Sequence, residues 1–188
     1  MLLPARAALN SARGCVFLEI LLNEFDTGKF IVFVRTKVRA ERVVMAMERA
    51  NISCEALHGG IDQDLRFAIL ERFRKGENTI LITTDVACRG IDIPSMDYVV
   101  NYDLPENPEN YVHRCGRTGR GNNKGHALSF CAENESVLLE EIEKYTGHEI
   151  EVFDLRPEDY HAIVGESESH DKNWKKLLSD NDNPESWD

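Results

Sequence analysis

The sequence has no apolar run that approaches the roughly 18–20 residues needed to cross a bilayer. It has only five cysteines among 188 residues, an odd number, and no C-x-x-C pair. This cysteine usage argues against both a disulfide framework and a zinc site, and it fits a reducing compartment. No internal repeat is visible, which argues against a solenoid. We therefore expect a cytoplasmic protein with no membrane segment and no structural metal.

The sequence also lacks the loop G-x-x-x-x-G-K-[ST], whose backbone cradles the phosphates of a bound nucleotide. Its one Gly-Lys pair, Gly28-Lys29, follows "NEFDT" and precedes Phe30. This pair cannot form such a cradle.

Acidic residues are in excess, with a formal net charge of -11, but they are unevenly spread. Residues 1–132 hold 17 Lys and Arg against 16 Asp and Glu, whereas residues 133–188 hold 5 against 17. The acidity therefore belongs to the carboxyl-terminal part. Because the first part is nearly neutral, the low overall pI does not exclude a nucleic-acid partner.

A chain of this length and hydrophobic content can bury one full core. We expect the globular domain over residues 28–156, after an irregular or helical leader over 1–27. The leader has no acidic residue before Glu19, a composition also found in mitochondrial transit peptides, but an irregular leader is the interpretation we favour. Residues 157–188 are polar, acidic and without periodicity, so we expect a largely disordered tail.

Strand and helix patterns alternate along the predicted domain. The apolar runs "FIVFV" and "TILIT" are typical of strands buried on both faces. Between them, Asp62 is a plausible N-cap and Gly76 a C-cap for a helix whose apolar positions are Leu65, Ile69 and Phe73. A later acid-rich helix places Leu138, Ile142 and Tyr145 along one side. Such alternation predicts an α/β fold, a parallel sheet sandwiched by helices.

Three polar or glycine-rich stretches follow predicted strands: "HGG", "TTDVACRGID" and "HRCGRTGR". Ligands of open parallel sheets bind beyond the carboxyl ends of the strands, so these stretches are predicted to meet at one edge. Arg117 and Arg120 stand three residues apart in a glycine-rich frame, which suits phosphate oxygens. A single arginine there would more often pair with Asp85, Asp92 or Asp103, but two arginines in such a frame favour an anion ligand.

Five ordered motifs carry a resemblance to a known family. They are "FIVFVRT", "ALHGGIDQDLR", "ITTDVACRGID", "VVNYDLP" and "YVHRCGRTGR". Over roughly residues 28–150 the chain resembles the second, carboxyl-terminal RecA-like domain of DEAD-box RNA helicases. His113-Arg114 is similar to this branch rather than to DNA-unwinding relatives, which usually carry Gln at the first of these positions. Cys88 and Cys115 depart from the usual alanine and isoleucine.

The resemblance implies a role for each matching residue. It makes Arg117 and Arg120 the catalytic arginine fingers that meet the γ-phosphate of ATP, with Asp92 contacting the nucleotide ribose. It implies RNA-backbone contacts, which are independent of sequence and sensitive to salt, from four residues. These four are Arg35, Gly60, Arg66 and Thr84. Coupling between the nucleotide and RNA sites is implied for Asp85, Gln63, His113 and Arg114; a hydrogen-bonded packed histidine is an equally good interpretation of His113, and an exposed glutamine of Gln63.

The resemblance further implies a hydrolase that uses ATP to unwind RNA duplexes, acting as one half of a two-domain enzyme. No D-E-A-D sequence occurs here, so Mg²⁺ and the phosphate cradle are expected on an amino-terminal RecA-like domain. By itself the chain is expected to be inactive. RNA, that first domain and a protein partner for the acidic tail are the expected partners. A stand-alone RNA- or protein-binding module and half of a DNA helicase are the alternatives.

Overall fold

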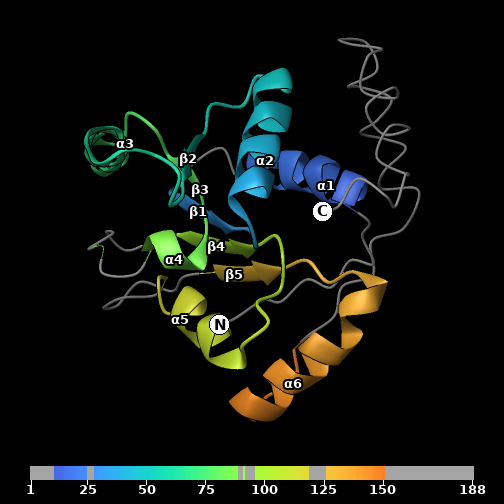
Figure 1. Ribbon diagram of the computed structural model, residues 1–188. Helices are drawn as coiled ribbons and strands as arrows, with labels where there is room; N and C mark the ends of the chain where they lie inside the picture. The colour runs from blue at the N-terminus through green and yellow to red at the C-terminus, as the bar shows by residue number, and fades with distance from the viewer. Residues whose placement is uncertain (1–10, 25–27, 89–90, 92–95, 119–125, 151–188) are drawn as a thin grey trace. The chain divides into compact units, whose positions relative to one another are not determined.

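Five parallel strands form the centre of the fold, in the order β2-β3-β1-β4-β5 (Figure 1). The computed structural model describes residues 11–24, 28–88, 91, 96–118 and 126–150. The strands are β1 (Phe30–Phe33), β2 (Glu55–Leu57), β3 (Ile80–Thr83), β4 (Tyr98–Asn101) and β5 (His126–Ser129). The helices are α1 (Ser11–Glu24), α2 (Lys37–Arg49), α3 (Gln63–Lys75), α4 (Asp85–Cys88), α5 (Pro108–Cys115) and α6 (Ser136–Thr146), with a 3₁₀ turn η1 (Glu133–Glu135) before α6. The predicted parallel sheet with helices on both faces is confirmed.

The strands are aligned so that their carboxyl ends lie level with one another. Phe33 of β1 pairs with Thr83 of β3 on one side and with Asn101 of β4 on the other. Leu57, the last residue of β2, also lies opposite Thr83. Every loop that leaves the sheet at this edge therefore starts from the same level, which we call the carboxyl edge.

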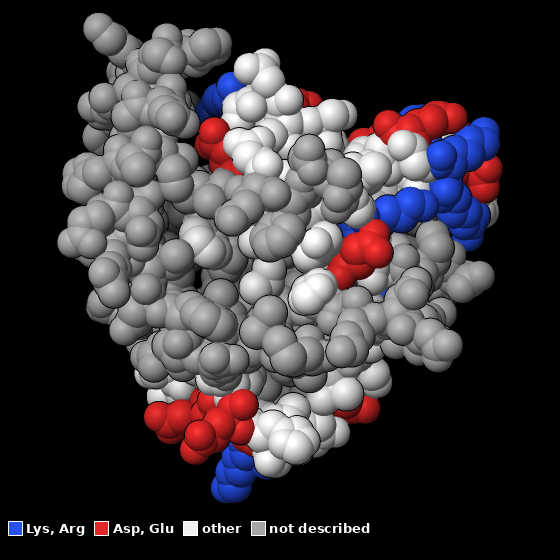
Figure 2. Space-filling view, turned by 180° about the vertical axis from the view of Figure 1, so that it is seen from behind, with Lys and Arg blue, Asp and Glu red and all other residues white. Residues whose placement is uncertain are grey.

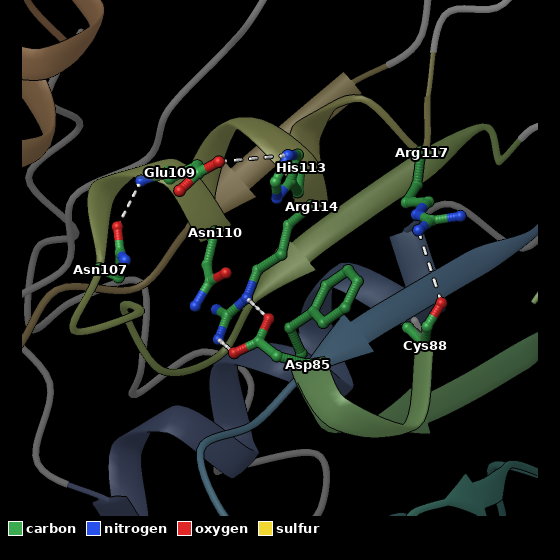
Figure 3. A pocket seen from close by; sticks show the side chains of 9 residues that line it. Asp85, Cys88, Asn107, Glu109, Asn110, His113, Arg114 and Arg117 are labelled. Atoms are coloured by element: carbon green, nitrogen blue, oxygen red, sulfur yellow. Dashed lines mark hydrogen bonds and ion pairs between the residues drawn. The ribbon is translucent and has the colours of Figure 1, made fainter. Parts of the chain in front are cut away.

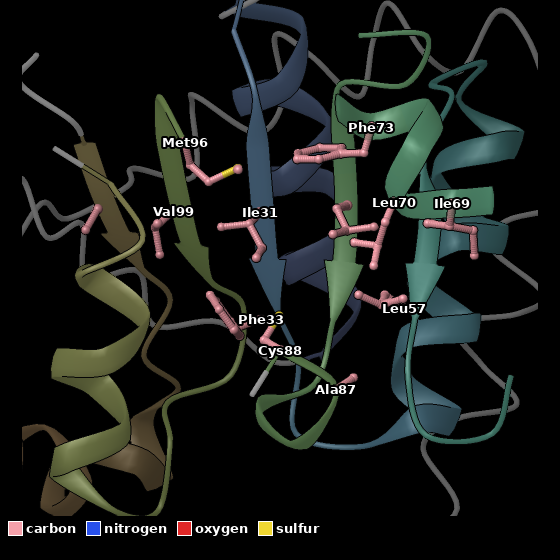
Figure 4. Packing of buried hydrophobic residues seen from close by; sticks show 12 residues of the cluster. Ile31, Phe33, Leu57, Ile69, Leu70, Phe73, Ala87, Cys88, Met96 and Val99 are labelled. Carbon is pink, nitrogen blue, oxygen red and sulfur yellow. The ribbon is translucent and has the colours of Figure 1, made fainter. Parts of the chain in front are cut away.

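The central strand β1 is apolar throughout because both of its faces are covered. Ile31 and Phe33 point into a buried cluster with Ile69, Leu70 and Phe73 of α3, as Figure 4 shows. Helices α1 and α2 lie behind the sheet in the same view. Residues of β1 and β3 are all buried, as the continuous apolar runs predicted for a parallel sheet.

Helix α3 begins and ends where its capping residues predict. The side chain of Asp62 accepts the backbone N–H of Leu65 at 2.8 Å, and Gly76 closes the helix with a φ of 76°. Within the helix, Ile69, Leu70 and Phe73 are buried, but Leu65 is 44% exposed. The predicted apolar stripe was therefore wrong at its first position, because the buried face of α3 is formed by Ile69, Leu70 and Phe73.

Helix α6 shows a similar shift of its buried face. Leu139 and Ile142 are buried, Leu138 is half-buried and Tyr145 is 59% exposed. The helix packs against α5 through a second apolar cluster that includes Leu104 and Tyr111. The predicted side is confirmed at Ile142 and at Leu138, which packs against the cluster, and it was wrong at Tyr145, which is exposed.

Helix α1 lies within the range predicted as a leader, and it contributes to the core. Its buried side chains are Phe17, Leu18, Leu21 and Leu22. The ring of Phe17 meets Phe130 edge-on, with centroids 4.9 Å apart. Gly14 lies so close to Tyr102 that a Cβ there would stand 2.8 Å from the tyrosine hydroxyl oxygen. The chain divides into two units, Met1–Asp154 and Leu155–Asp188; the predicted tail lies outside the described residues.

An aromatic stack closes the opposite, amino edge of the sheet. The ring of Tyr98 stacks on Phe30 with centroids 4.5 Å apart and on His126 with centroids 5.5 Å apart. These residues open β4, β1 and β5, and they lie side by side in register. The described part of the chain contains no helix with the length and apolarity required to span a membrane.

Candidate functional site

A pocket of about 460 Å³ opens at the carboxyl edge of the sheet, beside the ends of β1 and β3 (Figure 3). Its lining residues come from β1, from α4 and from the segment that leads into and out of α5. They are Phe33, Asp85, Cys88, Asn107, Glu109, Asn110, His113, Arg114 and Arg117. The two motifs "TTDVACRGID" and "HRCGRTGR", nearly thirty residues apart in sequence, therefore meet in one cavity, as their positions after neighbouring strands predict.

Arg114 forms the fixed wall of this pocket. Its Nε donates to Oδ1 of Asp85 at 2.6 Å and its Nη2 donates to Oδ2 at 2.7 Å. Its Nη1 donates to the backbone carbonyl of Asp103 at 2.7 Å and to Oδ1 of Asn101 at 3.2 Å. The guanidinium also lies 5.0 Å from the centroid of the Phe33 ring. With every edge of the fork occupied and 2% of its surface exposed, Arg114 is a buried brace between α5 and α4.

Arg117 differs from Arg114 in its hydrogen bonds, its burial and the compensation of its charge. Its guanidinium makes two long hydrogen bonds, to the carbonyl of Ile91 at 3.4 Å and to the carbonyl of Cys88 at 3.5 Å. It is half-buried and borders the open pocket. Long contacts to neutral carbonyls leave the positive charge of Arg117 uncompensated by any described carboxylate, which suits an anionic ligand.

His113 lies at the rim and points to the same cavity. Its Nε2 stands 4.0 Å from Oε1 of Glu109, one helical turn earlier in α5. Both side chains are more than half exposed. His113 is therefore available to a partner at this surface, and the interpretation as a packed, buried histidine does not describe its environment.

The thiol of Cys88 also lines the pocket. Burial is the main cause that raises the pKa of Cys88 to about 11, and the hydrogen bond with Thr83 only partly opposes it. Burial likewise raises the pKa of the nearby Cys115 to about 11. Both thiols are therefore neutral at physiological pH and fill space rather than act as nucleophiles.

The residues predicted to hold RNA follow three adjacent strands at the same edge. Arg35 follows β1, Gly60 follows β2 and Thr84 follows β3. The backbone N–H of Gly60 donates to Nδ1 of the buried His58 at 3.1 Å, which fixes the turn. Arg66 reaches from α3 to the backbone carbonyl of Ala87 in α4. The structure thus places all four at the carboxyl edge; their contact with RNA stays a prediction.

Gln63 opens α3 and is exposed. Among the described residues it makes no hydrogen bond to Arg66, which is instead oriented by α4. Asp92 and Arg120 lie outside the described residues, so their predicted roles at the ribose and the γ-phosphate stay predictions. No group of three His, Cys, Asp or Glu side chains able to hold a metal ion occurs in the described ranges.

Sequence reasoning did not identify Asn101, Asn107 or Asn110 as parts of the site. Asn101 is fully buried at the end of β4, where it binds Arg114 and also donates to the hydroxyl of Ser129 at 3.0 Å. A signal was present, because an amide inside the apolar strand "YVVN" requires a buried partner. Asn107 caps α5 through the N–H of Glu109 at 2.9 Å, and only the pocket shows its position in the site.

Comparison with known families gives one match that covers more than half of the chain. The model described as "Helicase conserved C-terminal domain" matches residues 15–122. Two relatives are an ATP-dependent rRNA helicase, rrp-3 of Neurospora crassa, and the ATP-dependent RNA helicase DbpA of Bacillus subtilis. The first is 36% identical over 88% of this chain and 33% of its own length; the second is 43% identical over 71% of this chain and 28% of its own. The chain thus spans about a third of these relatives or less.

Solved structures show the same fold. The Escherichia coli DEAD-box protein SrmB, bound to the regulator of ribonuclease activity RraA, has a TM-score of 0.77 at 31% identity, covering 82% of this chain and 91% of that one. Saccharomyces cerevisiae Dbp5, bound to RNA and ADP BeF₃, has a TM-score of 0.75 at 34% identity, covering 94% of this chain and 45% of that one. The predicted RecA-like fold class is confirmed.

Proposed function

The chain belongs to the family of helicase conserved C-terminal domains, and on this premise we propose that it acts as the second RecA-like domain of a DEAD-box enzyme that unwinds RNA with ATP. The pocket at the carboxyl edge carries the proposal. It places Arg117, whose guanidinium makes two hydrogen bonds of 3.4 and 3.5 Å, beside Arg114, whose guanidinium makes four of 2.6 to 3.2 Å. The side chain of Arg114 is thus fixed by the protein, while the side chain of Arg117 can bind an anion.

The residues present fit a triphosphate at this edge but do not fit its metal ion. Arg117 offers guanidinium N–H donors to phosphate oxygens, and arginines so placed stabilise charge on a transferring phosphoryl group. The carboxylate of Asp85 is occupied by Arg114, and the described residues contain no other set of ligands for Mg²⁺. We therefore assign the metal and the phosphate cradle to a first RecA-like domain, and we propose that this chain alone does not hydrolyse ATP.

The same arrangement provides a route from the RNA residues to the nucleotide residues. Thr84, proposed to hold the RNA backbone, directly precedes Asp85, which Arg114 grips. Arg66, a second proposed RNA contact, binds the carbonyl of Ala87 in the same short helix α4. A shift of α4 on RNA binding would therefore move Asp85 and its partner Arg114. Through Arg114, it would also change the position of Arg117, three residues later.

Partners follow from the same proposal. Relatives of this chain have been solved with RNA and with the protein RraA, and we extend the first of these ligand classes, RNA, to this chain. The five free cysteines fit the cytoplasmic location that we propose. A protein partner for the acidic tail belongs to the same proposal.

The decisive experiment joins this chain to its first domain and measures RNA-stimulated ATP hydrolysis. Arg117→Ala and Arg120→Ala are each expected to lower turnover by about 10³-fold or more, the range found for arginine fingers. Arg74→Ala is the matched control, because Arg74 lies on an exposed turn of α3 at the amino edge and is expected to leave turnover unchanged. Unchanged hydrolysis in both finger variants would refute the assignment.

A further inference from the structure

Arg35 is held at the carboxyl edge by a carboxylate a hundred residues away in sequence. Its Nη2 lies 2.7 Å from Oε1 of Glu135 and also donates to the carbonyl of Leu104 at 3.3 Å. Its Nε and Nη1 have no hydrogen-bond partner among the described residues. The guanidinium therefore has one edge bound to the protein and another edge open to solvent, with 39% of the side chain exposed.

Glu135 is the more firmly fixed member of this pair. Its side chain is only 14% exposed. Its second oxygen, Oε2, accepts the backbone N–H of Ala132 at 3.1 Å and so closes the turn η1 before α6. If Arg35 moved toward a ligand, Glu135 would stay in place, held by Ala132. The carboxylate would then be ready to receive Arg35 again.

The neighbouring charges leave no surplus of positive charge at this position. Asp103 accepts the backbone N–H of Arg35 at 2.8 Å, and its other oxygen lies 3.2 Å from Nε of Arg39. Two guanidinium groups are thus matched by two carboxylates at the end of β1. A surface that only binds phosphate would be expected to leave these cations uncompensated. On α3, too, basic side chains are paired with acids, Arg72 with Glu55 and Arg74 with Glu71, and Figure 2 shows Lys and Arg side chains gathered with Asp and Glu beside them.

We propose that Glu135 competes with RNA phosphate for Arg35 and so lowers the affinity of this contact for RNA. The inference rests on the proposed function, in which Arg35 binds the RNA backbone. An ion pair as exposed as this one contributes little net stability, so a phosphate group can displace it. The pair therefore makes the RNA contact reversible without abolishing it.

Without the charge of Glu135, the guanidinium of Arg35 should be available to an RNA phosphate without competition from a carboxylate. Each additional phosphate that a protein neutralises on a single strand makes the slope of log K against log[salt] steeper by about 0.7. At 0.1 M salt this corresponds to binding about fivefold tighter. Glutamine in place of Glu135 keeps an oxygen that can accept the Ala132 N–H, so the turn is expected to remain.

The test measures fluorescence anisotropy of a labelled ten-uridine RNA titrated with the full chain, over a series of salt concentrations. Glu135→Gln is expected to bind about fivefold tighter at 0.1 M salt, with the steeper slope. Glu140→Gln removes the same charge from an exposed position of α6, and it is expected to match the wild type. Glu135→Asp keeps the charge on a shorter side chain and is expected to fall between the wild type and Glu135→Gln. Thermal melting of each variant confirms that it is folded.

Arg35→Ala separates the two levels of the inference. Combined with Arg35→Ala, the Glu135→Gln substitution should lose its effect, because no cation remains to be released. If Arg35→Ala weakens binding while Glu135→Gln behaves like Glu140→Gln, the competition is overturned and the proposed function stands. If Arg35→Ala binds like the wild type, or if the wild type does not bind RNA even at low salt, the RNA contact at Arg35 itself fails.

Discussion

Arg114 grips Asp85 with two parallel hydrogen bonds of 2.6 and 2.7 Å, deep enough that only 2% of the arginine meets solvent. Three residues later, the guanidinium of Arg117 makes no hydrogen bond shorter than 3.4 Å to any described residue. Two arginines of one short motif therefore have opposite physical characters. Arg114 stabilises the folded domain, whereas Arg117 borders the pocket and can contact a ligand.

This contrast predicts different effects on stability. Arg114→Met leaves the carboxylate of Asp85 without its partner and is expected to lower the free energy of unfolding by about 3 kcal/mol, the lower end for a broken buried ion pair, since a quarter of Asp85 reaches solvent. Arg117→Met breaks only two long contacts and should change the free energy by less than about 0.5 kcal/mol. Urea denaturation of the full chain measures both. Equal losses in the two variants would contradict the assignment of Arg114 as the brace.

Gly14 provides a steric prediction for the contact between α1 and the sheet. A Cβ at this position would lie 2.8 Å from the hydroxyl oxygen of Tyr102 and 3.0 Å from its Cζ. The ring cannot yield easily, because it is 5% exposed and packs edge-on against Phe130. For so close a contact with a fixed ring we expect an overpacking cost of about 2–3 kcal/mol. The gain in helix propensity offsets about 1 kcal/mol of it, so Gly14→Ala is expected to destabilise by about 1–2 kcal/mol.

Two further variants make the Gly14 test specific. Gly59→Ala is the control, because a Cβ there meets nothing within 4 Å, and its stability is expected to match the wild type. Adding Tyr102→Phe to Gly14→Ala removes the closest atom and should recover part of the loss. A Gly14→Ala protein as stable as the wild type would show that α1 does not pack tightly on Tyr102. Chemical denaturation is again the measurement.

The buried thiols predict slow alkylation and loss of stability in alkali. Burial raises the pKa of Cys88 and of Cys115 from 9.0 to about 11, so at pH 8 their thiolate fractions are about 100-fold lower than in the unfolded chain. Iodoacetamide labelling, followed by mass spectrometry, should be slower by at least that factor than in urea. Because the folded pKa is the higher one, this stabilising contribution is complete below pH 9 and is lost as the pH rises through 11. Equal labelling rates in the folded and unfolded chains would contradict the burial of both thiols.

Two leucines of α3 test which face of the helix is buried. Leu70→Ala truncates a side chain that is 5% exposed in the buried cluster around Phe33 and Phe73. It is expected to lower the free energy of unfolding by about 2–5 kcal/mol. Leu65→Ala deletes the same atoms from a side chain that is 44% exposed, and it should cost less than about 1 kcal/mol. The order of the two unfolding midpoints decides between this helix face and the one that the spacing of Leu65, Ile69 and Phe73 predicts.

The comparison of α3 with its prediction shows what local pattern can and cannot determine. Asp62 and Gly76 predicted the ends of the helix because capping depends on hydrogen bonds within a few residues. Leu65 was predicted on the wrong side because burial depends on which other elements cover the helix, and the spacing of residues within the helix does not contain that information. Continuous apolar strands, by contrast, were predictable, since a strand covered on both faces is built mostly of apolar residues.

In the candidate site, too, some features could be predicted from the sequence and others could not. The order of strand ends predicted that the residues around Asp85 and Arg114 would meet at one edge. The sequence offered Asp85, Asp92 and Asp103 as partners for Arg117 or Arg120, and it named no partner for Arg114. The structure gives Arg114 the carboxylate of Asp85 and only the backbone carbonyl of Asp103. The Arg35–Glu135 pair could not be predicted at all, since it depends on where the turn before α6 packs.

The aromatic stack of Phe30, Tyr98 and His126 has a practical consequence for single-molecule work. It ties together the first residues of three neighbouring strands, at the edge opposite the pocket. Glu77 is exposed on the turn that enters β3 at this same edge. A dye or a surface tether attached at Glu77 would therefore lie at the amino edge, away from the pocket at the carboxyl edge.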